Sequence, residues 1–209
     1  MEKEELLIGI VPVGDLGWQF LDEIMIGVRN VLKDTFKNGK YRKVLCKPIT
    51  PRPTVMPPSA YDSRLGKYNI DPFFSWGLEQ KYKADRKLAQ SGRKIDKTLV
   101  ITNVQLFSYV NNCSVFGEAD TDYDIAVVSI NQLEKSASLE LIKERTIKEC
   151  AHELGHTLGL RHCNDKKCVM RQSVDVYDVD SKNKFFCDEC KNILRSIQFS
   201  KEYRSWKGP

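Results

Sequence analysis

The chain has 209 residues, of which 41% are hydrophobic and 29% are charged, and its formal net charge is +5. This size and composition are ordinary for one globular domain that buries a substantial core. The longest apolar run, residues 6–13, is too short to span a bilayer, and the acidic start MEKEE lacks the basic region of a signal peptide. We therefore expect a single domain over residues 1–209, cytoplasmic and without a membrane partner.

Charge and cysteine usage exclude two further classes. The positive charge is spread along the chain, and the basic cluster at residues 37–43 is read as a solvated face rather than a nucleic-acid site. We expect no nucleic-acid partner. Seven cysteines in a chain without a signal peptide disfavour a disulfide framework. Four of the seven fall within residues 163–190, and metal binding explains such a cluster better.

The first half of the chain predicts two strands and three helices. Residues 6–13 (LLIGIVPV) form a short continuous aliphatic run, which is typical of a buried strand. Apolar residues then recur at helical spacing from Phe20 to Leu32, and a second strand is expected at residues 44–49. The next segment, residues 48–58, holds five of the eight prolines and predicts an extended loop. The helices expected after it cover residues 61–67 and 76–90, with a break at residues 69–75.

The second half predicts three strands and two helices. Strands are expected at residues 98–107 and 125–130, and the shorter stretch 114–119 (SVFGEA) suits an edge strand or a bulge. A helix begins near Ser138 and ends at Gly159, where a C-cap glycine belongs. A final helix is expected over residues 188–199. Early and central strands separated by long helices predict an α+β fold with a mixed β-sheet.

All three histidines lie in the stretch HELGHTLGLRH, residues 152–162. His152 and His156 are four apart, so on a helix they project from one face at a separation that a single zinc ion can bridge. Glu153 lies next to the first ligand and can act as general base on a metal-bound water. Gly159 can adopt positive φ and turn the chain so that His162 faces the same metal. Three imidazoles leave a fourth position for water, whose pKa zinc lowers to about 7.

Chance is the alternative explanation of this motif. An isolated HExxH pattern is a weak signal, because histidine and glutamate meet by accident on many exposed helices. The full pattern of residues 152–162 is far more specific: with three histidines and twelve glycines in the chain, random placement gives it with a probability of roughly a few in a million. The sequence therefore predicts a catalytic zinc site.

The cysteine cluster predicts a second metal site. Cys163 and Cys168 flank four residues, and Cys187 and Cys190 form a CxxC at the start of the last expected helix. Four thiolates in two such pairs are the usual composition of a closed structural zinc site. The alternative is a redox-active CxxC, which the spacing of the first pair and the lack of a βαβ context disfavour. We expect two Zn²⁺ per chain, one catalytic and one structural.

These motifs resemble those of the archaemetzincins, a family of metzincin-like zinc peptidases. The resemblance rests on HExxHxxGxxH, the cysteine directly after the third histidine, the C-x4-C-x-M segment and the terminal CxxC, and it is most specific over residues 149–190. It is weaker over residues 6–129. It implies that His152, His156 and His162 bind the catalytic zinc and that Glu153 is the base. It also implies that Cys163, Cys168, Cys187 and Cys190 bind the second zinc.

Three further roles follow from the resemblance, each beside a plainer reading. Met170 is expected in the tight Met-turn beneath the catalytic metal, which is compatible with its being a core methionine. The stretch 114–119 is the candidate edge strand for pairing with substrate, although its glycine and glutamate also suit a blunted edge. Tyr177 is either a group near the metal or an ordinary loop residue. Acidic residues after Met170 suggest a preference for basic or polar substrate side chains.

The resulting hypothesis is a metzincin-like mixed β-sheet with an active-site helix and a zinc-clamped C-terminal lobe. The sheet lobe is expected over about residues 1–160 and the zinc-bound lobe over about residues 161–209. The expected activity is zinc-dependent hydrolysis of peptide bonds in a peptide or protein substrate, through a metal-bound water activated by Glu153. The alternative is a catalytically latent, zinc-stabilised peptide-binding protein. A monomer is expected in either case.

Overall fold

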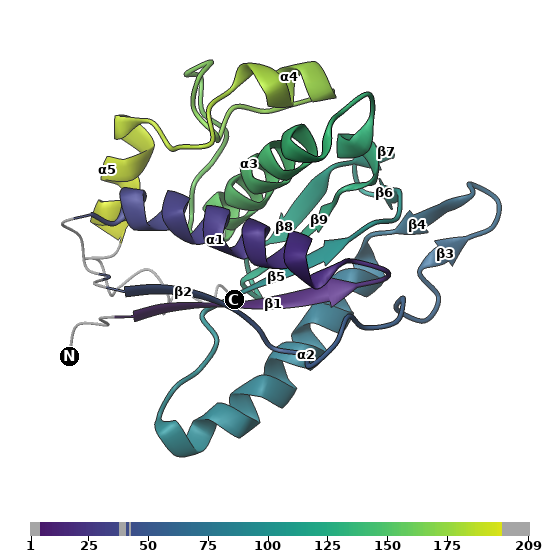
Figure 1. Cartoon of the computed structure of the whole chain (residues 1–209), viewed down its shortest axis with the longest axis horizontal. Coiled ribbons are helices and arrows are strands. Elements are labelled where there is room, and N and C mark those ends of the chain that lie inside the picture. Colours follow the sequence, from purple (N-terminus) through teal and green to yellow (C-terminus); the bar gives the residue numbers. More distant parts are fainter. Residues whose placement is uncertain (1–4, 38–40, 42, 198–209) are drawn as a thin grey trace, which may run out of the picture.

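The structure, a computed structural model, describes residues 5–37, 41 and 43–197, and its centre is a five-stranded mixed sheet in the order β2-β1-β5-β9-β8 (Figure 1). The neighbouring pairs are parallel except for β8 and β9, which run antiparallel. The strands are β1 (Glu5–Val13), β2 (Lys43–Pro48), β5 (Lys97–Thr102), β9 (Ile125–Ser129) and β8 (Gly117–Asp120). The predicted α+β class with a mixed sheet is confirmed, and β8 is an edge strand of that sheet.

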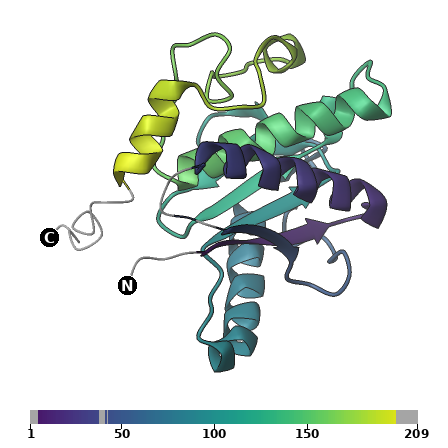
Figure 2. The same ribbon diagram turned by 60° about the vertical axis from the view of Figure 1, so that its left-hand side comes forward.

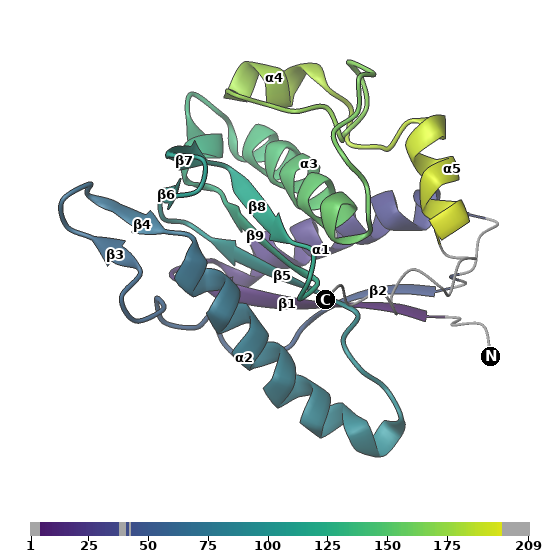
Figure 3. The same ribbon diagram turned by 180° about the vertical axis from the view of Figure 1, so that it is seen from behind.

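Helices cover both faces of this sheet. On one face lie α1 (Trp18–Thr35) and α3 (Leu139–Thr157), and on the other lies α2 (Asp71–Leu88), which the short 3₁₀ helix η1 (Ala89–Ser91) follows (Figures 1 and 3). The central strands β5 and β9 are buried along their whole length, because both of their faces are covered. This double coverage explains why each strand has a continuous apolar centre, residues 99–101 and 125–128, rather than an alternating pattern.

A second, four-stranded sheet lies at one end of the main sheet, in the order β3-β4-β6-β7. Its strands are β3 (Tyr61–Asp62), β4 (Lys67–Asn69), β6 (Leu106–Ser108) and β7 (Cys113–Val115). The helix predicted over residues 61–67 is therefore wrong, because this segment is a hairpin. The carboxylate of Asp62 accepts hydrogen bonds from the backbone N–H groups of Arg64 and Leu65, and Gly66 has a φ of 65°. This local turn chemistry outweighs helix propensity.

Other boundaries also differ from the prediction. The strand expected at residues 98–107 is divided between β5 and β6, which belong to different sheets, and the stretch 114–119 is divided between β7 and β8. The break expected at residues 69–75 ends early, because α2 begins at Asp71 with a proline in its first turn. The two divided strands change sheet through pairing with distant strands, which apolar patterning does not report, whereas the proline at the start of α2 is a local signal.

The C-terminal segment packs on the α1–α3 side of the sheet. The 3₁₀ helix η2 (Asn131–Glu134) leads into α3, and α4 (Val176–Ser181) and α5 (Asp188–Ile197) follow it. Figure 2 shows α5 beside the end of α1, where Lys191 forms a 2.7 Å ion pair with Asp34. Of the final helix expected over residues 188–199, the last two residues lie outside the described part. Among the described residues, no helix has the length and apolar content needed to cross a membrane.

Candidate metal centre and catalytic site

The helix α3 carries the first two histidines and ends where the third can join them. It begins after Ser138, whose hydroxyl accepts a 3.3 Å hydrogen bond from the backbone N–H of Leu141. At its C-terminus Gly159 has a φ of 100° and donates to the carbonyl of His156, while Leu160 donates to the carbonyl of Gly155. This pair of bonds is the Schellman motif, which reverses the chain and confirms the predicted C-cap.

The three histidines lie together, with ligand nitrogens no more than 4.8 Å apart. The Nδ1 atom of His152 lies 2.8 Å from the carbonyl oxygen of Val169, and that of His156 lies 2.9 Å from the carbonyl oxygen of Leu160. Because a carbonyl only accepts, each Nδ1 carries the proton and each Nε2 keeps a free lone pair. The chain therefore presents these two imidazoles with their Nε2 atoms available to a metal.

The donor set fits a zinc ion. The Nε2 atoms of His152 and His156 lie 3.1 Å apart, close to the roughly 3.3 Å expected between two nitrogens at zinc-bond length in a tetrahedron. Burial lowers the pKa of all three histidines, and the nearby ammonium of Lys182 lowers each of them further. Neutral imidazoles are the form that binds a metal, so the site is in its ligand form at neutral pH.

Glu153 lies beside the histidines with its side chain buried. Burial raises the pKa of its carboxyl group well above the usual range, and the neighbouring carboxylate of Glu149 raises it further. Across from it is Gly117 of the edge strand β8, where an added Cβ would lie 3.0 Å from the Cγ of Glu153. A carboxyl group with a raised pKa is suited to accept and return a proton near neutral pH.

Met170 packs directly against the histidine-bearing helix. It is fully buried, and a Cβ added at Gly155 would overlap its Sδ atom. Its backbone carbonyl accepts a 2.9 Å hydrogen bond from Cys163. The absence of a side chain at Gly155 is what lets Met170 lie under the helix turn that carries both His152 and His156.

The four cysteines of the C-terminal segment also lie together, with every Sγ atom within 4.8 Å of the others. The Sγ atoms of Cys163 and Cys187 are 3.8 Å apart, and those of Cys168 and Cys190 are 3.7 Å apart. Four sulfurs at about 2.3 Å from a central zinc in a tetrahedron are separated by about 3.8 Å. These distances match a Cys₄ zinc site and are far too long for a disulfide.

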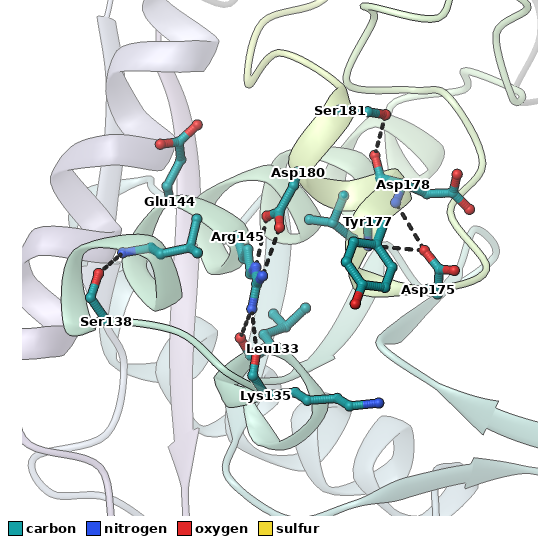
Figure 4. Close-up of polar contacts among 12 residues, drawn as sticks. Leu133, Lys135, Ser138, Glu144, Arg145, Asp175, Tyr177, Asp178, Asp180 and Ser181 are labelled. Atoms are coloured by element: carbon teal, nitrogen blue, oxygen red, sulfur yellow. Dashed lines mark hydrogen bonds and ion pairs between the residues drawn. The ribbon is translucent and has the colours of Figure 1, made fainter.

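The loop between Met170 and the CxxC is attached to α3 by the buried cations Arg145 and Lys148, of which Figure 4 shows the contacts of Arg145. The guanidinium of Arg145 forms two 2.7 Å contacts with the carboxylate of Asp180 and also donates to the backbone carbonyls of Leu133 and Lys135. The ammonium of Lys148 donates to the carbonyl of Val179 at 3.1 Å. These contacts hold α4 on the active-site helix, in a stretch where the sequence predicted no helix.

The acids of this loop have structural partners. Asp175 caps α4 by accepting from the N–H groups of Tyr177 and Asp178, Asp178 accepts from the N–H of Val174, and Asp180 binds Arg145. They therefore give no support to the suggested preference for basic substrate side chains. The ring of Tyr177 is exposed on α4, and no contact with a histidine is found for it among the described residues.

The sequence analysis did not identify the buried charged residues of α3 that precede His152. Three charged residues precede His152 on α3 at helical spacing, so that all four side chains lie on one helix face: Arg145, Lys148 and Glu149. All four are buried. A stripe of charged residues leading along a helix to a metal-ligand motif is the signal that could have identified them.

Comparisons with known proteins agree with this geometry. Residues 74–196 match the model of Peptidase family M54. The chain is 31% identical over 196 residues to an archaemetzincin of Haloarcula marismortui, an alignment that covers 90% of this chain and 99% of that protein. It is 41% identical over 129 residues to an archaemetzincin of Sulfolobus acidocaldarius, covering 58% and 72% of the two chains.

Two solved structures share the fold. The crystal structure of archaemetzincin from Methanopyrus kandleri superposes with a TM-score of 0.66 and 28% identity, over 91% of this chain and 94% of that one. A zinc-dependent peptidase from Methanocorpusculum labreanum superposes with a TM-score of 0.68 and 21% identity, over 90% and 99% of the two chains. At that lower identity the second likeness shows the fold alone.

Proposed function

The chain belongs to Peptidase family M54, the archaemetzincins, and is a zinc-dependent metallopeptidase; within this activity we propose that Glu153 is the general base. We further propose that His152, His156 and His162 hold the catalytic zinc. The observation that carries the proposal is one cluster: three imidazoles within ligand distance of one another, two with Nδ1 bound to a carbonyl, beside a buried carboxyl group of raised pKa.

In the proposed mechanism the histidines bind the metal, Glu153 transfers a proton, and two backbone carbonyls orient the histidines. The three histidines would hold a zinc ion, which when bound would supply Lewis acidity toward a peptide carbonyl and toward water. Glu153 takes a proton from the attacking water, which its raised pKa favours, and then passes that proton to the leaving amine. The carbonyls of Val169 and Leu160 keep His152 and His156 in the tautomer that binds metal.

The edge strand β8 provides a surface for substrate backbone. It is the last strand in the order of the main sheet, so its outer edge pairs with no other described strand. An extended peptide can add to such an edge through backbone hydrogen bonds. Because Gly117 of this strand lies against Glu153, a peptide paired there runs past the general base.

We propose a purely structural role for the second zinc, held by Cys163, Cys168, Cys187 and Cys190. Burial raises the pKa of the Cys168 thiol to about 11, so this thiol stays protonated at neutral pH unless a metal ion replaces the proton. Four thiolates leave no open position for water or substrate. The expected cytoplasmic location and monomeric state stay predictions.

The test is cleavage of a diverse peptide library by the zinc-loaded protein, read by mass spectrometry with the zinc content measured alongside. We expect two zinc ions per chain, and cuts that disappear with a chelator and return with added zinc. Retention of peptides without cuts, with both zinc ions present, would instead establish the latent peptide-binding protein. A single zinc ion per chain would contradict the proposed pair of sites.

A further inference from the structure

A buried ion pair lies behind the histidine cluster. The side chain of Lys182 is fully buried, that of Glu149 is 4% exposed, and the Nζ of Lys182 lies 2.9 Å from Oε1 of Glu149. The same ammonium donates a 3.2 Å hydrogen bond to the backbone carbonyl of Arg171. Burying two charges costs several kcal/mol per ion before their attraction offsets it, so an ion pair at this depth needs a reason other than stability alone.

The Lys182–Glu149 pair is connected to His152 at both of its ends, through α3 and through the segment around Met170. Glu149 lies on α3 three residues before His152, so the two share a helix face. Lys182 joins Glu149 to the carbonyl of Arg171. Two residues before Arg171, the carbonyl of Val169 lies 2.8 Å from Nδ1 of His152. The position of that carbonyl, and with it the ring of His152, therefore depends on how the segment around Met170 is held.

Holding α4 in place does not by itself require Lys182. Arg145 already binds Asp180 through two contacts, and Lys148 donates to the carbonyl of Val179, so two cations fix α4 on the same helix face. Lys182 differs from them because its second partner belongs to the segment directly after Met170.

We propose that Lys182 is a positioning residue for the catalytic metal: through Glu149 and the carbonyl of Arg171 it fixes the segment whose Val169 carbonyl orients His152. The inference rests on the proposed zinc-binding role of His152. Partners that orient a metal ligand typically contribute 10–100-fold in metal affinity. The contacts of Lys182 are with Glu149 and the carbonyl of Arg171, so its removal is expected to act on the histidine site through these two groups.

The test compares Lys182→Met with Lys148→Met in the full chain. Zinc affinity is measured by competition with a chromophoric chelator, and the Cys₄ site of each variant serves as the internal reference. Lys148 on α3 is an equally buried lysine, but its contacts are with Glu144 and α4, which makes it a matched control. We expect Lys182→Met to weaken the histidine site by about 10–100-fold. Lys148→Met should change that affinity by less than about threefold.

A second variant keeps the test decisive if Lys182→Met does not fold. Glu149→Gln retains the ammonium and its bond to Arg171 but removes the charge pair, and we expect about tenfold weaker zinc binding at the histidine site. Unchanged affinity in the folded Lys182 or Glu149 variants, or equal losses in Lys148→Met, would overturn the inference. His152→Ala separates the two proposals: if this variant keeps wild-type zinc binding, the proposed metal site is itself wrong.

Discussion

Gly117 is the residue of β8 that lies against Glu153. A Cβ at this position would be 2.6 Å from the carbonyl oxygen of Val127 and 3.0 Å from the Cγ of Glu153. The first contact is with the backbone of the neighbouring strand, which cannot rotate away, so an added methyl group must displace either β8 or the glutamate. The glycine is therefore what allows the edge strand and the carboxyl group of Glu153 to approach so closely.

Gly117→Ala is expected to lower kcat by about 10–100-fold while both zinc ions stay bound, because a shift near 1 Å in a reacting group costs about that much. The measurement is steady-state kinetics on a peptide cut by the wild type, together with zinc analysis. Gly17→Ala is the matched control, since a Cβ there meets no atom within 4 Å. A kcat within about twofold of wild type in both variants would show that Glu153 is not placed by this contact.

Among helices, the end of α3 decides whether the third histidine can reach the other two. Gly159, at a φ of 100°, allows the Schellman turn, and the carbonyl of Leu160, the next residue, binds Nδ1 of His156. The same turn thus reverses the chain toward His162 and orients a ligand already on the helix. A residue with a Cβ atom is less stable than glycine in this left-handed backbone conformation, by about 1–2 kcal/mol.

For Gly159→Ala we expect a fall of about 1–2 kcal/mol in the free energy of unfolding and a weaker histidine zinc site. Gly92→Ala isolates the second effect, because Gly92 has a φ of 66° beyond η1 and a Cβ there meets no atom within 4 Å. Denaturant unfolding and chelator competition on both variants provide the comparison. Equal zinc affinity in the two variants would contradict a role of this turn in the metal site.

The elements that the sequence predicted well are those whose pattern is local. Residues 6–13 form a continuous aliphatic run, α3 has a serine N-cap and a glycine after its end, and both metal-ligand motifs have fixed spacings. The hairpin β3–β4 was missed although the turn at Asp62 is also local, because that turn was predicted to be a helix. The helix α4 depends in part on Arg145 of α3, which is distant in the sequence. The Lys182–Glu149 pair joins residues 33 positions apart, which no periodicity reports.

At the scale of the whole molecule, the two predicted metal sites are joined by direct contacts and pack against the same hydrophobic core. Cys163 directly follows His162 in the chain and donates its N–H to the carbonyl of Met170, which itself lies under Gly155 of the active-site helix. Cys190 and Leu194 of α5 belong to the same buried cluster as Leu32 of α1. The C-terminal segment is therefore continuous with the core that supports the sheet, and the proposed zinc at the cysteines would fix the loop that packs beneath the histidines.

The most direct test of the account is turnover of a cleaved peptide by Glu153→Gln, with the zinc content of the same sample measured in parallel. The substitution keeps the size of the side chain and removes its ability to carry a proton between water and the leaving amine. We predict two zinc ions per chain and a loss of at least about 100-fold in kcat. A variant that binds both zinc ions and cuts within about tenfold of the wild-type rate would contradict the role assigned to Glu153.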